Sequence, residues 1–183
     1  MKKHRPGEID VMYFDKLPPR CKELFFQFLN DSNIPEKYRA NFCHVNAFYY
    51  DECESPIEVI LNFAFDMVAF CTEGYGSSIY LIPQYEVVAN GKNYRIDLFF
   101  DSNECESPFA HFKPYKLAIE CDGHDYHEKT KAQVKKNNQR DLDLKMEGYD
   151  IIHFSGSQIY NEPLKCANDL IKYILLHVGG EHE

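Results

Sequence analysis

Two apolar segments of this chain carry acidic residues, and this combination constrains the fold and the site more than any other feature. Asp97 lies inside the strand-like run 94–100. Glu120 lies near the end of the run 117–121, and Asp122 directly follows that run. Strands disfavour aspartate, and burying a lone carboxylate costs several kcal/mol unless it is paired or bound to a metal. We therefore expect these acids to form one polar site in a sheet.

Alternation along a strand puts Glu120 and Asp122 on the same face, because they are two residues apart. If the strand of Asp97 is its neighbour, three carboxylates converge, and they repel one another unless a cation neutralises them. Oxygen ligands favour a hard ion, Mg²⁺ or Mn²⁺, which keeps several waters for the substrate and the nucleophile. The residues alone therefore predict an acidic site for a divalent cation.

Helical periodicity is clearest at 56–73, where apolar residues recur at offsets of three and four. Ser55 supplies an N-cap, Pro56 suits the first helical position, and Glu58 completes a capping box. Gly74 ends this helix. Further helices are expected at 20–30, 127–147 and 163–178, with short candidates near 36–42 and after Pro108.

Four strands are expected, the first two joined by the hairpin signal Asn90-Gly91. They cover 79–88, 93–100, 117–121 and 149–154. The helix between the last two strands requires a parallel strand pair. The element order predicts an α/β fold of three layers, with a mixed central sheet flanked by helices. The 183 residues suit a single compact unit, with 1–54 as an N-terminal cap on a main domain at 55–183.

Asp97 followed by Glu120-Cys121-Asp122 resembles the core motif of the PD-(D/E)xK nuclease superfamily. The order of helix, hairpin, strand, helix, strand and helix is also that of the superfamily, and the resemblance covers about residues 55–178. It is closest to the very-short-patch-repair-like endonucleases, some of which have an E-x-D-G-x-x-H stretch and a following helix with Arg-Asp. In this chain the corresponding Arg-Asp dipeptide is Arg140-Asp141, in the helix expected at 127–147. The resemblance implies a restriction-endonuclease-like fold.

The resemblance also implies metal-assisted hydrolysis of DNA phosphodiester bonds. Asp97, Glu120 and the carbonyl of Cys121 would ligate Mg²⁺ or Mn²⁺. Asp122 stands where the superfamily has its catalytic lysine, so it would hold a second metal or orient the attacking water. His124 or His127 would act as general acid or base. The positive charge of the missing lysine would come from Arg140, Lys129 or His124. Glu58 would act on the metal through water, and Gln84 would play a lesser part.

A net charge of −9 does not favour nucleic-acid binding by the chain as a whole, since phosphates are held by Lys and Arg. Charge distribution matters more than the sum. Residues 129–140 contain basic and polar side chains and no acid. The expected nucleic-acid contacts are Lys129, Lys131, Lys135, Lys136 and Arg140. The competing interpretation is that these charges only solvate a helix face.

Each candidate residue also has a simpler interpretation. Glu58 can act as a helix cap alone, and Asp97 can form an ion pair with Arg95 or Arg140. His124 and His127 can be surface residues, and Asp122-Gly123 can be only a turn. A zinc site of Cys121, His124 and His127, with His111 and His153 elsewhere, is less favoured because Cys121 points away from Glu120 on a strand.

Two other functions compete with that of a DNA endonuclease. One is an inactive binding module that keeps the fold, and the absent lysine favours it. The other is an RNA-directed nuclease. The seven scattered cysteines, with no C-x-x-C pair, fit reduced thiols. No apolar run reaches the ~20 residues of a membrane helix, so a cytoplasmic protein without a membrane partner is expected.

Overall fold

The structure, a computed structural model, describes residues 16–36, 38, 52–72, 79–104, 113–123 and 130–179. The helices are α1 (Pro19–Asn30), α3 (Pro56–Cys71), α4 (Lys131–Met146), α5 (Gly156–Asn161) and α6 (Pro163–Val178). The strands are β1 (Ile82–Ala89), β2 (Lys92–Asp101), β3 (Lys116–Asp122) and β4 (Asp150–Ser155). No helix of the described ranges is long and apolar enough to cross a bilayer.

The four strands form one open mixed sheet in the order β1-β2-β3-β4. The pairs β1–β2 and β2–β3 are antiparallel, and β3–β4 is parallel, as the intervening helix predicts. The hairpin turn was also predicted correctly. Asn90 and Gly91 have φ angles of 49° and 69°, the left-handed conformation that a tight two-residue turn requires.

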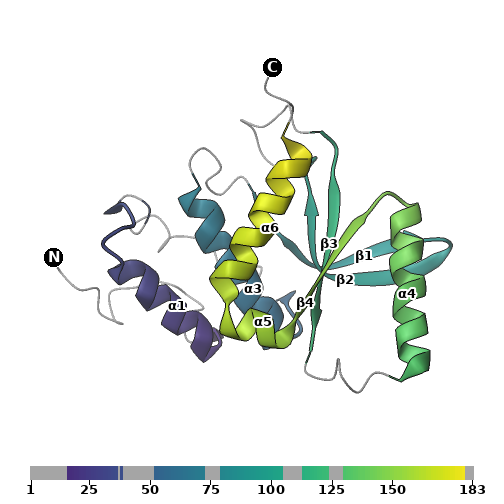
Figure 1. Ribbon diagram of the computed structural model, residues 1–183, viewed down its shortest axis with the longest axis horizontal. Helices are drawn as coiled ribbons and strands as arrows, with labels where there is room; N and C mark the ends of the chain where they lie inside the picture. The colour runs from purple at the N-terminus through teal and green to yellow at the C-terminus, as the bar shows by residue number, and fades with distance from the viewer. Residues whose placement is uncertain are drawn as a thin grey trace.

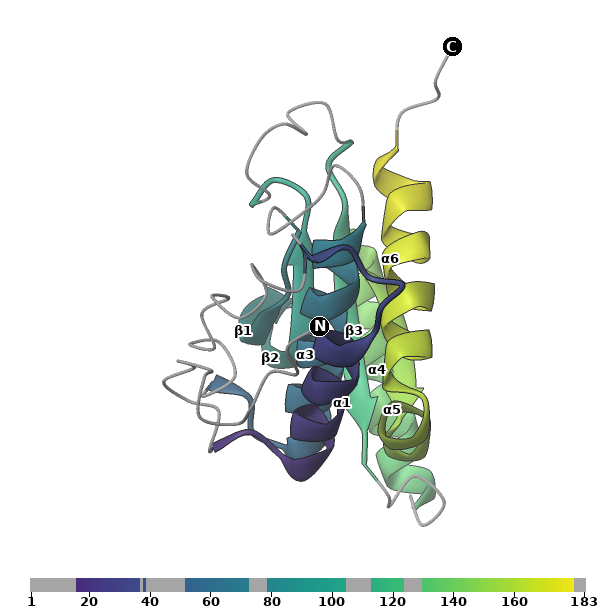
Figure 2. The ribbon, with the colours of Figure 1, turned by 90° about the vertical axis from the view of Figure 1, so that its left-hand side faces the viewer.

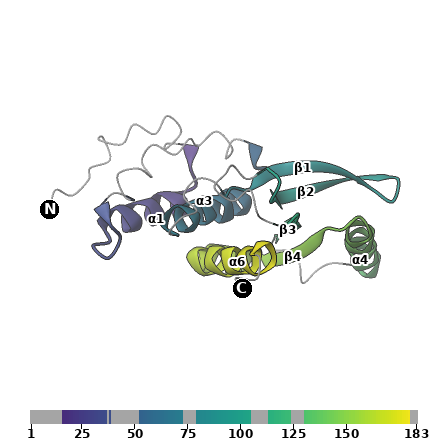
Figure 3. The ribbon, with the colours of Figure 1, turned by 90° about the horizontal axis from the view of Figure 1, so that it is seen from above.

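Helices cover both faces of this sheet (Figure 1). Helices α3 and α6 lie side by side on one face, and α1 packs on α3, so that all three share the larger hydrophobic core (Figure 2). Helix α4 lies on the other face over a smaller core that includes Ile96, Phe99 and Leu144 (Figure 3). The predicted α/β architecture with flanking helices is therefore confirmed.

The alternation of faces shifts by one residue in the middle of β1 and β2. Ile82 and Tyr85 both contact the α4-side core, and so do Ile96 and Phe99, with two residues between them in each strand instead of one. Gln84, with φ 52°, lies at the shift. The hairpin thereby keeps an apolar face towards α4 on both sides of the kink, and the kink re-aims the residues within it.

Some helix boundaries were predicted wrongly because the capping residues were not recognised. Helix α3 ends at Cys71 with Thr72 as its cap. Helix α4 begins after Thr130, whose hydroxyl forms a capping box with Gln133, and not at 127. Helix α5 was missed, although Ser155 and Gln158 form the same box. The candidate helix near 36–42 lies largely outside the described residues, and the one after Pro108 lies wholly outside them.

A fully buried carboxylate attaches α4 to the hairpin. Asp143 accepts hydrogen bonds from Asn90 Nδ2 at 3.0 Å, Lys92 Nζ at 2.8 Å and Gln139 Nε2 at 2.8 Å, and also from the Tyr94 hydroxyl. These bonds, Lys92 and Tyr94 first, hold the pKa of Asp143 well below its usual range. Asp143 and Leu144 are the buried residues of α4, so this contact fixes the helix on the sheet.

We expect Asp143→Asn to lower the midpoint of thermal unfolding at pH 7 by several degrees, because an amide cannot accept from four donors. The pKa of Asp143 is lowered from 3.8, so the ionised group stabilises the fold above about pH 4 and loses this effect in stronger acid. Circular dichroism should show the gap to wild type closing below pH 4. Asp169→Asn, on the exposed face of α6, is the control. A gap that is the same at every pH would contradict this role of the charge.

Candidate functional site

Asp97 bridges β2 and β3 where the two strands separate. The last backbone pair on this side is Leu98 with Ile119, and beyond it the Cys121 amide donates to Asp97 Oδ2 at 2.8 Å. Burial raises the pKa of Asp97 from 3.8 to about 7, and the neighbouring charge of Glu120 contributes to that rise. The two predicted metal-site carboxylates are therefore brought together, on adjacent strands, as the sequence predicted.

Glu120 is buried and forms a two-pronged ion pair with Arg140 of α4. Arg140 Nη1 and Nη2 donate to the two Glu120 oxygens at 2.6 Å each, and Nη2 also donates to the Arg95 carbonyl at 2.6 Å. Burial raises the pKa of Glu120, and Arg140 opposes that rise. Arg95 itself pairs with Glu54, so it is Arg140 that supplies the positive charge at this site.

Glu58 has the capping role that the sequence predicted, and it also reaches the sheet. Its carboxylate accepts from Ser55 Oγ at 2.7 Å and from the Glu54 amide at 2.9 Å, while Ser55 Oγ accepts from the Glu58 amide. Gln84 Nε2 of β1 donates to Glu58 Oε2 at 2.7 Å. Glu58 is close enough to Asp97 for its charge to raise the pKa of Asp97. The N-terminus of α3 thus borders the acidic site.

A histidine joins Asp122 to helix α4. His153 Nδ1 lies 3.1 Å from Asp122 Oδ2, and His153 Nε2 lies 3.2 Å from Asp141 Oδ2. His153 is paired with Glu120 in the parallel register of β3 and β4, so it faces the same side. Sequence reasoning considered His153 only as a remote zinc ligand. No pattern in the chain indicates which residue of β4 lies beside Glu120, because register is a tertiary property.

The pairing registers place these residues in one row across the sheet. Gln84 and Asp97 lie opposite each other between two paired positions of β1 and β2. Asp97 and Glu120 lie one step beyond the last pair of β2 and β3, and Glu120 is paired with His153.

The donor set at Asp97 and Glu120 fits a hard divalent ion that keeps most of its waters. Two carboxylates and water are a common protein contribution to Mg²⁺. The raised pKa of Asp97 reflects burial and crowded negative charge, which a cation would relieve. Within the described ranges, however, no three His, Cys, Asp or Glu side chains are grouped to hold a metal by themselves. His124 and His127 lie outside these ranges.

A zinc site at Cys121 is not supported. The side chain of Cys121 packs against the larger core, on the face opposite Glu120. Burial raises the pKa of its thiol well above the usual value, which disfavours the thiolate that zinc requires. His111 also lies outside the described residues.

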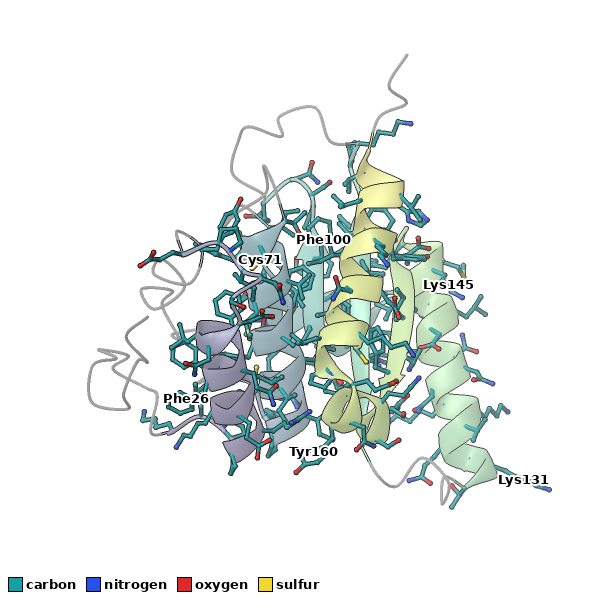
Figure 4. The ribbon with its side chains drawn as sticks, turned by 60° about the vertical axis from the view of Figure 1, so that its left-hand side comes forward. Phe26, Cys71, Phe100, Lys131, Lys145 and Tyr160 are labelled. Atoms are coloured by element: carbon teal, nitrogen blue, oxygen red, sulfur yellow. The ribbon has the colours of Figure 1, made fainter. Side chains whose placement is uncertain are left out.

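The predicted nucleic-acid contacts divide into two groups. Lys131, Lys135 and Lys136 are exposed on the first half of α4, and Figure 4 shows Lys131 projecting from the end of the helix. Arg140 belongs instead to the carboxylate cluster, where 20% of its side chain is exposed, so it lies at the site as one of its predicted catalytic residues, and its contact with nucleic acid remains a prediction. Lys129 lies outside the described residues.

Comparisons with protein-family models, with curated proteins and with solved structures found no match. The functional interpretation therefore depends on the residues and their geometry. An open mixed sheet of four strands with helices on both faces is compatible with a restriction-endonuclease-like fold.

We expect Asp97→Asn to stabilise the metal-free protein at pH 8 by ~1–3 kcal/mol, since one pKa unit corresponds to about 1.36 kcal/mol. The pKa of Asp97 is raised on folding from 3.8 to about 7, so wild type loses stability as the pH rises through this window. Asparagine can still accept from Cys121. Urea unfolding in EDTA at pH 4, 6 and 8 would measure the difference, which should be smallest at pH 4.

Asp169→Asn is again the matched control, because that exposed acid should give no such pH-dependent gain. A variant that is less stable than wild type at pH 8 in EDTA would mean that the Asp97 charge is satisfied by the protein itself.

Proposed function

We propose that this protein is a metal-dependent endonuclease that hydrolyses phosphodiester bonds in DNA. The observation that supports it most directly is the proximity of half-buried Asp97 and buried Glu120, two carboxylates from adjacent strands. A fold gains nothing in stability from crowding two acids, and such pairs are typical of sites that handle a cation. In this proposal the fold is of the restriction-endonuclease-like type.

Asp97, Glu120 and the carbonyl of Cys121 would hold Mg²⁺ or Mn²⁺. When bound, such an ion acidifies a water ligand and stabilises the negative charge that develops on the phosphate. Asp97 is fixed for this role by the Cys121 amide, and Glu58 borders it at the N-terminus of α3. The protein thus orients its carboxylates before the ion arrives.

Arg140 takes the electrostatic part that the superfamily gives to a lysine. Its guanidinium holds Glu120 in one orientation and lies close enough to Asp97 to favour the ionised form. A guanidinium carries five N–H donors in a planar fork, so it can keep one carboxylate oxygen and still donate to a phosphate oxygen. Arg140 would therefore neutralise both the site and the substrate.

Asp122 and His153 would handle the proton. Asp122 lies on the same face of β3 as Glu120 and is hydrogen bonded to His153. A histidine oriented by carboxylates at both ring nitrogens can act as a general acid or base. His124 and His127 remain candidates for the same role.

An inactive binding module is the second candidate, and one observation favours it. Arg140 already satisfies both oxygens of Glu120, and Asp122 stands where the lysine would be. A cation must share Glu120 with Arg140 before cleavage can proceed. A protein that only binds nucleic acid through the lysines of α4 does not need a cation to share Glu120 with Arg140.

We expect wild type to cut plasmid DNA with Mg²⁺ or Mn²⁺ and not with EDTA. Asp97→Ala and Glu120→Ala should lower the rate by about 100-fold or more, because residues one layer behind a metal ligand already cost about 10- to 100-fold. Agarose gels with plasmid and with RNA measure cleavage and substrate class. Asp169→Ala is the control.

The outcomes separate the candidates. Cleavage that persists in Asp97→Ala would contradict the site. Binding of DNA without cleavage of either polymer would favour the binding module, and cleavage of RNA alone would favour the RNA-directed enzyme.

Lys135→Glu with Lys136→Glu should weaken DNA binding and reduce the salt dependence of log K by about 2, roughly one unit for each phosphate that the variant no longer neutralises. Both lysines are exposed on α4. Fluorescence anisotropy at several salt concentrations measures the slope. Lys172→Glu on the exposed face of α6 is the matched control. An unchanged slope would mean that DNA does not bind along this half of α4.

A further inference from the structure

Gln84 has a backbone conformation that its position in a strand does not explain. Its φ of 52° is left-handed, and glutamine rarely adopts that region outside turns. The neighbouring pairs, Pro83 with Leu98 and Tyr85 with Ile96, keep the register on both sides of it. Strained residues of this kind cluster at binding and catalytic sites, where the surrounding structure holds them in place. Gln84 lies opposite Asp97.

The orientation of the Gln84 amide is fixed by chemistry. Nε2 donates to Glu58 Oε2 at 2.7 Å, and a carboxylate can only accept, so the amide nitrogen must face Glu58. The amide oxygen therefore points away from Glu58. It is buried and has no hydrogen-bond partner among the described residues. Because an unsatisfied buried acceptor is costly, it points to a ligand that the protein binds.

The surroundings of this oxygen indicate what kind of ligand it awaits. Gln84 is hydrogen bonded to Glu58 and lies opposite Asp97, and the charges of Glu58 and Glu120 both act on Asp97. A carbonyl oxygen among carboxylates cannot bind an anion. It can accept from water or contribute to a cation that binds oxygen.

We propose that Gln84 Oε1 is the third protein oxygen of the cation site, alongside Asp97 and Glu120, and that it holds Mg²⁺ or Mn²⁺ directly or through one water. This inference rests on the proposed metal site. The proposed ligand from β1 is a neutral amide oxygen, not a carboxylate, histidine or cysteine. The kink in β1 then has a function, because it turns this amide to the site.

The test is Mn²⁺ binding without nucleic acid, measured by isothermal titration calorimetry. Gln84→Met keeps the length of the side chain and removes its oxygen, so Mn²⁺ should bind about tenfold more weakly. Gln84→Glu replaces the amide oxygen by a carboxylate. This variant should bind Mn²⁺ more tightly than wild type. In EDTA it should unfold at a lower temperature, because the new carboxylate would repel those of Glu58, Asp97 and Glu120.

Gln139→Met is the matched control, because Gln139 also uses its amide nitrogen to bind a buried carboxylate, that of Asp143. This substitution should lower the unfolding temperature and leave Mn²⁺ affinity unchanged. A folded Gln84→Met protein with wild-type Mn²⁺ affinity would overturn the inference. If that variant does not fold, Gln84→Glu decides, and binding no tighter than wild type would overturn it.

The same titrations keep this inference separate from the proposed function. Wild type that binds no Mn²⁺ and cuts no DNA would remove the metal site and the inference together. Wild type that binds Mn²⁺ and cuts, with Gln84→Met unchanged in affinity, would remove only the role of Gln84.

Discussion

The ion pair between Arg140 and Glu120 is the contact on which the site depends. Glu120 and Arg140 expose only 9% and 20% of their side chains, so each charge has given up much of its water. A buried pair of this kind contributes little net stability, but removing one partner leaves an uncompensated charge that is strongly destabilising. The pair also connects α4 to β3 and, through the Arg95 carbonyl, to β2. The ion pair therefore fixes the position of the basic helix α4 over the acidic residues of β2 and β3.

The site lies where the alternation of β1 and β2 between the two hydrophobic cores shifts by one residue. The larger core on the α3 and α6 side and the smaller core under α4 use different residues of β2, and the change occurs around Asp97. Ile96 and Phe99 face the smaller core and Leu98 and Phe100 face the larger one, so Asp97 lies at the shift. Polar groups from β1, β2, β3 and α4 gather at this shift, and their hydrogen bonds and ion pair explain why acids are tolerated in an otherwise apolar sheet.

The sequence predicted most of the fold because its local signals agree with one another. The final helix was placed at its observed bounds, and the hairpin turn followed from Asn90-Gly91 alone. The helix ends were predicted less well, because Thr130 and Ser155 set them as caps, each through a single hydroxyl group. The proximity of Asp97 and Glu120 was predicted, since acids inside apolar segments of adjacent strands have few other arrangements.

The sequence by itself determined the element order, the acidic character of the site and the basic, polar surface of α4, because these depend on residue type and local spacing. Only the tertiary structure decided that Arg140 turns inward to Glu120, that His153 joins Asp122 to Asp141, and that Gln84 faces Glu58. Except for the shorter link between His153 and Asp141, these contacts join residues that are separated by 20 to 31 positions in the sequence. They depend on strand register and on the docking of α4, which no local pattern encodes.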